Sequence, residues 1–301
     1  MKKVILVAGA TGNLGERIAH ILWQKGAEVR AIVRESSDNE KVNKLEKLGV
    51  KVFKVNMLNV EEITKACVGV DCVVSALAGL QDVIIDTQKV LLDAAIAAGV
   101  PRFIPSDYSL DFTKFSDGEN RNLDLRRAFH TYFDKAPIAA TTIFNNAFMD
   151  MLTDQMPLIL FKQKRILYWG DADHKMAFTT IQNTAEYTAN VALDPSTPRF
   201  LHIAGDQLSP REFQSLLTDL TGEKFGFFRP GGLSLLSTII KIARFFNSGE
   251  KDVYPAWQGM QYMRNMIDAR SNLDKSDNNR YSDMHWTTVK DLLSAHLKNE
   301  K

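Results

Sequence analysis

The sequence predicts an α/β fold: a doubly wound parallel sheet with a smaller, interleaved C-terminal α+β part. The first observation is an apolar run at Val4–Ala8 that breaks into a glycine-rich turn and resumes with helical spacing from Glu16. The second is that strand-like and helix-like runs alternate as far as Phe144 with short connections, as in a parallel sheet covered on both faces. The third is a change of pattern after residue 150 to short strands between helices.

The composition is that of an ordinary soluble globular protein. The 301 residues are 45% hydrophobic and 24% charged, and a formal net charge of +1 creates no overall field that attracts nucleic acid or an anionic membrane. We therefore expect neither of these partners. Cys67 and Cys72 are too few for a disulfide framework or a metal site, so we expect no metal and a reducing cytoplasm. The N-terminus enters a strand without an apolar leader, and no apolar run reaches membrane-spanning length, which also favours a cytoplasmic protein.

The elements expected after the first strand and helix follow from hydrophobic periodicity. Strands are expected at 28–33, 50–55, 71–77, 102–105, 139–144, 165–171, 175–180 and 200–204. Helices are expected at 39–48, 60–66, 81–98, 120–133, 183–193, 233–246, 286–297 and from Ser209. We predict a nucleotide-binding domain over 1–150, with 181–204 returning to it, and a smaller substrate-binding domain over 151–180 and 205–301.

The glycine turn after the first strand is the strongest local signal. Gly9 permits a sharp turn, Gly12 lets a bound group approach the backbone, and Gly15 lets the helix pack close to the strand. The N–H groups of the first helical turn then point at one place, which suits a pyrophosphate. The turn follows a buried-type strand and opens a helix, the context that a Rossmann-type dinucleotide motif requires. The predicted cradle consists of Gly9, Thr11, Gly12, Asn13, Leu14 and Gly15.

The end of the second strand predicts which dinucleotide binds. At this position an acidic residue favours a free ribose 2′-hydroxyl, whereas an arginine favours a 2′-phosphate. Arg34 can hold a phosphate in its fork, and Ser36 or Ser37 can add a hydroxyl donor, so we expect NADP. Glu35 is acidic, so NAD remains an alternative cofactor. A solvated pair of Arg34 and Glu35 without a ligand is the structural alternative.

The fourth predicted strand ends in small residues. Ser75 and Ala76 let a nicotinamide ring or its ribose lie against the strand end. A loop that only needs to be compact is the alternative.

Four segments, taken in order, resemble the NmrA-like group of atypical short-chain dehydrogenase/reductases, which includes the isoflavone-reductase-like enzymes. They read VAGATGNLG, AAIAAGVPRFIPSDYS, NLDLRRAFHTYFDKAPIAATTIFNNAFMDML and ILYWGDADHKMAFTTIQNTAEYTANVALDP. The resemblance implies a dinucleotide-binding domain with a smaller substrate domain. It also implies either an NADPH-dependent reductase of phenolic, alkene or quinone-like substrates or a non-catalytic protein that senses NADP(H).

Two departures from related enzymes limit that inference. The Tyr-x-x-x-Lys pair of ordinary short-chain dehydrogenases is absent, because Phe112 follows Tyr108 and Ala136 follows Tyr132 at that spacing. The isoflavone-reductase-like enzymes have a lysine four residues before an Arg-Arg pair, and here that position is Asn122. Asparagine can hydrogen-bond a substrate but cannot act as an acid or base near neutral pH.

An electrophilic acceptor such as a quinone needs little acid catalysis. We therefore predict hydride transfer from NAD(P)H to a small apolar carbonyl, alkene or quinone-like acceptor. The candidate catalytic residues are Tyr108, Asp107 and Asn122, with Asn146 as an orienting amide and His130 and Lys114 as weaker candidates. Ordinary packing is the alternative for each of them.

The second hypothesis is a redox-sensing regulator without turnover, which the missing Tyr-Lys pair and Asn122 favour. An epimerase or dehydratase is disfavoured because it needs a strong base. The apolar helix 233–246 and the aromatic and methionine-rich segment 254–266 suit a flat apolar or aromatic small molecule, a homodimer interface or a protein partner. Simple core packing is the alternative for both segments.

Overall fold

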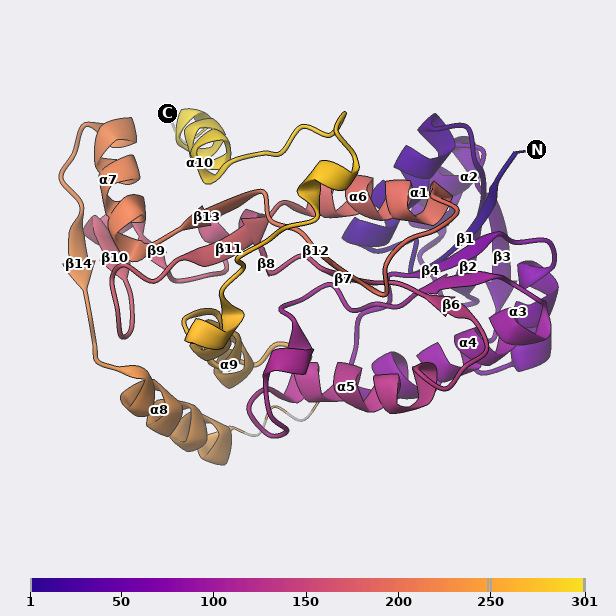
Figure 1. Cartoon of the computed structure of the whole chain (residues 1–301), viewed down its shortest axis with the longest axis horizontal. Coiled ribbons are helices and arrows are strands. Elements are labelled where there is room, and N and C mark those ends of the chain that lie inside the picture. The colour runs from indigo at the N-terminus through magenta and orange to yellow at the C-terminus, as the bar shows by residue number, and fades with distance from the viewer. Residues whose placement is uncertain (1, 248, 250, 300–301) are drawn as a thin grey trace.

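The computed structural model describes residues 2–247, 249 and 251–299. In Figure 1 the N-terminal strands and their helices occupy one end of the molecule. The short strands β9, β10 and β14 and the helix α7 occupy the other, and the C-terminal segment runs back across the structure.

The main sheet has six parallel strands in the order β3-β2-β1-β4-β5-β6, which is the Rossmann order, so the predicted fold class is confirmed. Its strands are β1 Val4–Ala8, β2 Glu28–Arg34, β3 Lys51–Val55, β4 Cys72–Ser75, β5 Arg102–Ile104 and β6 Ala139–Ala140. The strand order reverses between β1 and β4, where Ala8 lies opposite Ser75.

Both faces of the sheet are covered by helices. Ile5 and Val7 face a core formed with α1 and α6, whereas Leu6 and Ala8 face a core formed with α3, α4 and α5. Both faces of β1 are therefore buried, which explains why its sequence is a continuous apolar run. The helices of this part are α1 Asn13–Gln24, α2 Asn39–Lys47, α3 Val60–Cys67, α4 Gln88–Ala97, α5 Arg121–Phe133 and α6 Ile181–Leu193.

The predicted strand 139–144 is two strands. β6 pairs with β5, whereas β7 Thr142–Phe144 leaves the main sheet and pairs with β12 Phe200–His202. The predicted helix 81–98 is also divided, because it opens with a π-helical turn, η1 Asp82–Thr87. The carbonyl of Ile84 in this turn accepts a hydrogen bond from the side chain of Gln88.

The C-terminal part contains several small sheets and four helices. Its strands are β8 Ala147–Phe148, β9 Ile159–Leu160, β10 Arg165–Leu167, β11 Met176–Thr179, β13 Asp206–Leu208 and β14 Gly226–Phe228. Its helices are α7 Pro210–Thr221, α8 Leu233–Phe246, α9 Ala256–Met266 and α10 Val289–Asn299. Short 3-10 turns occupy Phe112–Lys114, Met149–Thr153, Phe161–Gln163, Ala269–Ser271 and Asn278–Arg280.

One expected boundary in this part needs correction. The last helix begins at Val289 and not at residue 286, because the Thr288 hydroxyl accepts from the N–H of Asp291 and caps the helix there. For the segment 254–266 the structure favours the core-packing alternative, since Trp257, Met263 and Met266 are buried.

The return of 181–204 to the nucleotide-binding part, and the two-domain division as a whole, remain predictions. α6 lies against α1, as Figure 1 also shows, and β12 pairs with β7. Among the residues that the model describes, no helix combines the length and apolarity needed to cross a bilayer.

Gly15→Ala should destabilise the fold. A Cβ at this position would collide with the backbone carbonyl of Gly9, and neither backbone segment can move without disturbing the sheet. We expect a loss of about 1–3 kcal/mol in the free energy of unfolding, measured by urea titration. Gly12→Ala is the matched control, because its Cβ would meet only the Gly9 carbonyl at 3.3 Å, and its loss should be clearly smaller. Equal losses would contradict the steric role of Gly15.

Candidate functional site

The glycine turn is closed on one side and open on the other. Gly9 has φ +83°, and a Cβ there would lie 2.5 Å from the carbonyl oxygen of Ala76 at the end of β4. Gly15 packs against Gly9 in the same way. Gly12 and Asn13 are exposed and Leu14 is half-buried. The turn therefore packs tightly against β4 and presents its Gly12 side outward.

The N-terminus of α1 lacks a side-chain cap. Its N-cap residue is Gly12, whereas Asp38, Asn59, Asn120 and Ser209 cap α2, α3, α5 and α7 with their side chains. The side chain of Asn13 instead accepts from Arg17 at 2.9 Å. The backbone donors of the first turn are thus left for an anion.

The other predicted cofactor residues lie around this edge of the sheet. Arg34 ends β2 and is exposed together with Ser36, and in the described part of the chain no residue forms a hydrogen bond or ion pair with the Arg34 side chain. Ser75 is buried, and its hydroxyl lacks a partner among the described residues. The N–H of Ala76 donates to the carbonyl of Ala8.

Asp107 and Tyr108 face opposite sides of the sheet. Asp107 contacts α5, whereas Tyr108 belongs to the core formed with α1 and α6. The Tyr108 hydroxyl is buried beside Thr188, whose own hydroxyl donates to Thr184, and burial raises the pKa of Tyr108 above its usual value. The two adjacent candidates therefore do not form one catalytic pair.

Asp107 is a fully buried carboxylate in a polar network. Its Oδ2 accepts from His130 Nε2 at 2.7 Å and from the Thr142 hydroxyl at 2.8 Å. Arg199 approaches His130 Nδ1 at 2.8 Å, and an arginine can only donate, so the imidazole proton lies on Nε2. Burial alone raises the pKa of Asp107, but His130, Thr142 and Arg126 outweigh it and lower the pKa below 3.8. Asp107 thus ties β5 to α5 and β7.

Asn122 lies in the first turn of α5 and is buried. Its Nδ2 donates to the carbonyl of Val253 at 3.0 Å, and its Oδ1 accepts from Arg121 Nε at 3.1 Å. The hydroxyl of Tyr262 lies beside it. Asn122 therefore links α5 to the segment that precedes α9.

The remaining candidates have structural contacts. Asn146 has φ +61°, and its Nδ2 donates to the carbonyl of Ile203. Lys114 donates to the carbonyl of Asn272. Among the described residues, no three His, Cys, Asp or Glu side chains are grouped so that they could hold a metal ion.

The sequence interpretation missed a buried polar contact between α5 and α9. Asn120 Oδ1 accepts the N–H groups of Asn122 and Leu123, which fixes the orientation of this amide. Its Nδ2 then donates to Asn265 Oδ1 at 3.0 Å, and Gln258 Nε2 donates to Asn120 Oδ1 at 2.7 Å. Asn265 Nδ2 and Gln258 Oε1 are left buried without partners. Polar residues repeated along one face of a methionine-rich helix were the available signal.

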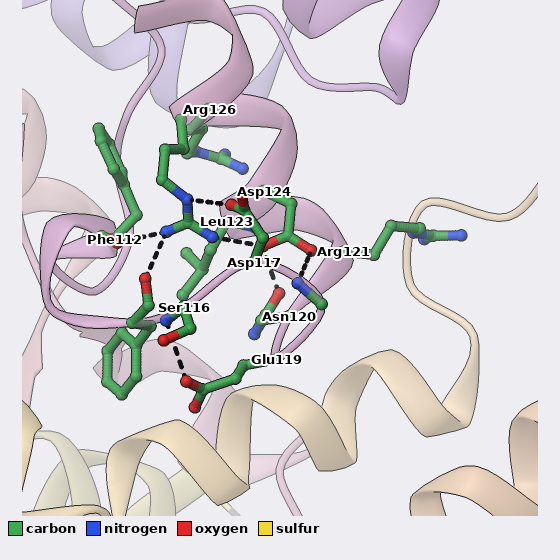
Figure 2. A network of polar contacts seen from close by, with 12 residues as sticks. Phe112, Ser116, Asp117, Glu119, Asn120, Arg121, Leu123, Asp124 and Arg126 are labelled. Carbon is green, nitrogen blue, oxygen red and sulfur yellow. Dashed lines mark hydrogen bonds and ion pairs between the residues drawn. The ribbon is translucent and has the colours of Figure 1, made fainter.

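The loop that precedes α5 is organised around Arg127. Its guanidinium donates to Asp117, to Asp124 and to the carbonyls of Phe112 and Phe115. Figure 2 shows Asp117 and Asp124 gathered at the start of α5, with Arg126 outside this network. These contacts therefore fix the loop immediately before α5.

Asp107→Asn should destabilise the protein at neutral pH by about 2–4 kcal/mol, because it weakens a buried charge-assisted network. The pKa of Asp107 is lowered on folding, so its contribution is complete above pH 3.8 and is lost as the pH falls through the lowered value. The difference between wild type and variant, measured by urea unfolding, should therefore shrink below pH 3.8. Asp134→Asn, on the exposed side of the same network, is the control and should have a smaller effect. A difference that stays constant down to strong acid would contradict this role.

Two named plant proteins resemble this chain in sequence. It is 27% identical over 208 residues to isoflavone reductase homolog P3 of Arabidopsis thaliana. It is 29% identical over 217 residues to pinoresinol reductase 2 of the same plant. Each match covers 65% of this chain and 66% of the relative, so the chain spans just under two thirds of the length of these relatives.

Solved structures show the same fold. The crystal structure of an isoflavone reductase superposes with a TM-score of 0.83 at 19% identity, covering 98% of this chain and 99% of the other. AtPrR2 with NADP+ and (+)pinoresinol gives 0.79 at 22% identity, with 98% and 99% coverage. The NmrA-like family model matches residues 1–292. The chain therefore belongs to the NmrA-like family.

Proposed function

We propose that this protein is an NADP(H)-dependent oxidoreductase that transfers hydride to a small apolar carbonyl, alkene or quinone-like acceptor. The observation that carries the proposal is the uncapped start of α1, which follows a glycine turn at the point where the strand order reverses. Open parallel sheets bind dinucleotides at this point.

The residues of the turn fit a pyrophosphate. A side chain at Gly9 or Gly15 would strike backbone, so these two glycines shape the turn. Gly12 has φ −88°, which any residue can adopt, and a Cβ there would make one tight contact, at 3.3 Å from the Gly9 carbonyl oxygen. This contact is much less severe than those at Gly9 and Gly15, so the close approach of a ligand is the reason that we propose for a glycine at this position.

The comparisons support the choice of cofactor. Solved structures with this fold include AtPrR2 with NADP+ and leucoanthocyanidin reductase with NADPH from Vitis vinifera. The Arg34 side chain has no partner among the described residues and stands at the end of β2, where a ribose 2′-phosphate would lie. Ser36 could add a hydroxyl donor, whereas Glu35 leaves NAD as the alternative.

The side chains near the acceptor bind and orient it. NADPH supplies the hydride when bound. Ser75 and Ala76 give β4 a small-residue end, and the buried Ser75 hydroxyl has no hydrogen-bond partner among the described residues. Asn122 in the first turn of α5 and the hydroxyl of Tyr262 on α9 lie side by side and can hydrogen-bond an oxygen that gains charge. Because burial raises the pKa of Tyr262 to about 12, the hydroxyl stays protonated and can donate.

A sensor of NADP(H) without turnover is the second candidate, and Asn122 favours it. This side chain replaces the lysine of the isoflavone-reductase-like enzymes, and its amide is already bonded to Val253. The two candidates share the nucleotide site and differ only in whether an acceptor is reduced.

A turnover assay distinguishes the oxidoreductase from the non-catalytic sensor. Purified protein, NADPH and a panel of quinones and enals should show loss of NADPH absorbance. Gly12→Val should abolish this loss, because its side chain would occupy the space of the pyrophosphate. Circular dichroism should show that the variant is folded. Tight NADPH binding without reduction of any panel member would favour the sensor, and the absence of binding would exclude both.

Arg34→Ala tests the choice between the two dinucleotides. Loss of a charge-assisted contact to a 2′-phosphate should weaken NADPH binding by about 10- to 100-fold. NADH lacks this phosphate, so its dissociation constant should change by less than about 3-fold. Calorimetric titration of both nucleotides measures this. Equal losses would refute the phosphate role, and Lys25→Ala, on the C-terminal side of α1, is a control that should change neither constant.

A further inference from the structure

Arg126 is a buried cation with almost no internal partners. It lies on α5 with 8% of its surface exposed. Its Nη1 donates to the carbonyl of Asn122 at 2.9 Å, and its Nε is buried without a partner. Within residues 2–247, 249 and 251–299, no carboxylate lies within ion-pair distance of its guanidinium.

Two neighbouring arginines show how this helix normally satisfies such a group. Arg127 donates to two carboxylates and two carbonyls. Arg121 donates to the carbonyls of Asp252 and Val253 and lies over the ring of Trp257 at 4.7 Å. Arg126 is more buried than either, and Figure 2 shows it outside the acidic network beside it.

Burial of a cation is costly unless an anion or several hydrogen bonds compensate it. Asp107 is an internal carboxylate that interacts with this cation, because Arg126 is among the groups that lower the pKa of Asp107, although its effect is the smallest of them. The Oδ2 of Asp107 is already taken by His130 and Thr142, and its Oδ1 has no partner. The internal compensation of Arg126 is therefore incomplete.

Arg126 lies on the same face of α5 as Asn122 and His130, because the three residues are four apart along the helix. His130 hydrogen-bonds to Asp107, which follows the C-terminal end of β5. Asn122 donates to the carbonyl of Val253, which precedes α9, and Arg126 also lowers the pKa of the Tyr262 hydroxyl on α9. The face of α5 that carries Arg126 therefore connects the C-terminal end of β5 with the segment around α9.

We propose that Arg126 binds an anionic oxygen of the substrate, which is a carboxylate or an ionised hydroxyl on an aromatic or quinone-like ring. The proposal rests on the proposed function for its acceptor class. It narrows the substrate from a neutral apolar molecule to an acidic one. Asn122 and the Tyr262 hydroxyl would share the same oxygen-rich end of the ligand.

The first experiment compares two naphthoquinones that differ at one ring substituent. Menadione is neutral, whereas lawsone, a hydroxynaphthoquinone, is an anion at neutral pH. Calorimetric titration of the NADP+-loaded protein should show that lawsone binds at least about 10-fold more tightly than menadione. Arg126→Gln should weaken lawsone by about 10- to 100-fold and menadione by less than about 3-fold, and Arg126→Lys should restore part of the difference.

Equal or absent binding of the two quinones by the wild type overturns the proposal, and so does an equal loss of both in Arg126→Gln. A separate titration with NADP+ alone tests the proposed function. If NADP+ does not bind, that function fails, and lawsone titrated into the nucleotide-free protein still tests Arg126.

The second experiment needs no ligand. An uncompensated cation destabilises the free protein, so the urea midpoint of Arg126→Met should equal or exceed that of wild type. Arg127→Met is the matched control on the next residue and should lower the midpoint, because it leaves Asp117 and Asp124 without their partner. A midpoint for Arg126→Met as low as that of Arg127→Met would show that Arg126 is a structural counter-charge to Asp107, and would overturn the proposal.

Discussion

The close backbone contact between the glycine turn and the end of β4 determines the geometry of the whole functional edge. Gly9 approaches Ala76, and Gly15 approaches Gly9, at distances that admit no side chain. These contacts fix the start of α1 beside the reversal in strand order. The first-turn donors of the helix gain a fixed direction because the sheet holds them there, and a rigid set of donors binds an anion at lower entropic cost.

The central strands β1 and β4 could be predicted from the sequence because they are buried on both faces and read as apolar runs. Local sequence could not predict the division of 139–144, since β7 leaves the main sheet only to pair with β12 nearly sixty residues later. The contact of Asn120 with Gln258 and Asn265 was hidden for the same reason. The polar residues along one face of α9 indicate a polar contact, but neither segment identifies its partner in the other.

The candidate site shows the same limit at the scale of single residues. Asp107 and Tyr108 are neighbours in the sequence and seemed equally close to an acceptor. In extended backbone, successive side chains point to opposite sides, and here one joins α5 and the other joins the core with α6. The alternation of side-chain directions in extended backbone, applied to this loop, predicts that the two side chains point apart. The motif position of Asn122 was correctly placed at the start of α5, but its contact with Val253 depended on tertiary structure.

The arrangement of charge around α5 connects these observations. Its first turns carry three arginines, and within the described part of the chain only Arg127 is paired with carboxylates. Arg121 is compensated by carbonyl groups and an aromatic ring, which holds the segment before α9 against Asn122. Arg126 remains, between a carboxylate that is already bonded and a tyrosine that stays protonated. A fold that needed only stability would gain from an apolar residue at this position, whereas a binding site gains from a cation whose partner arrives with the ligand.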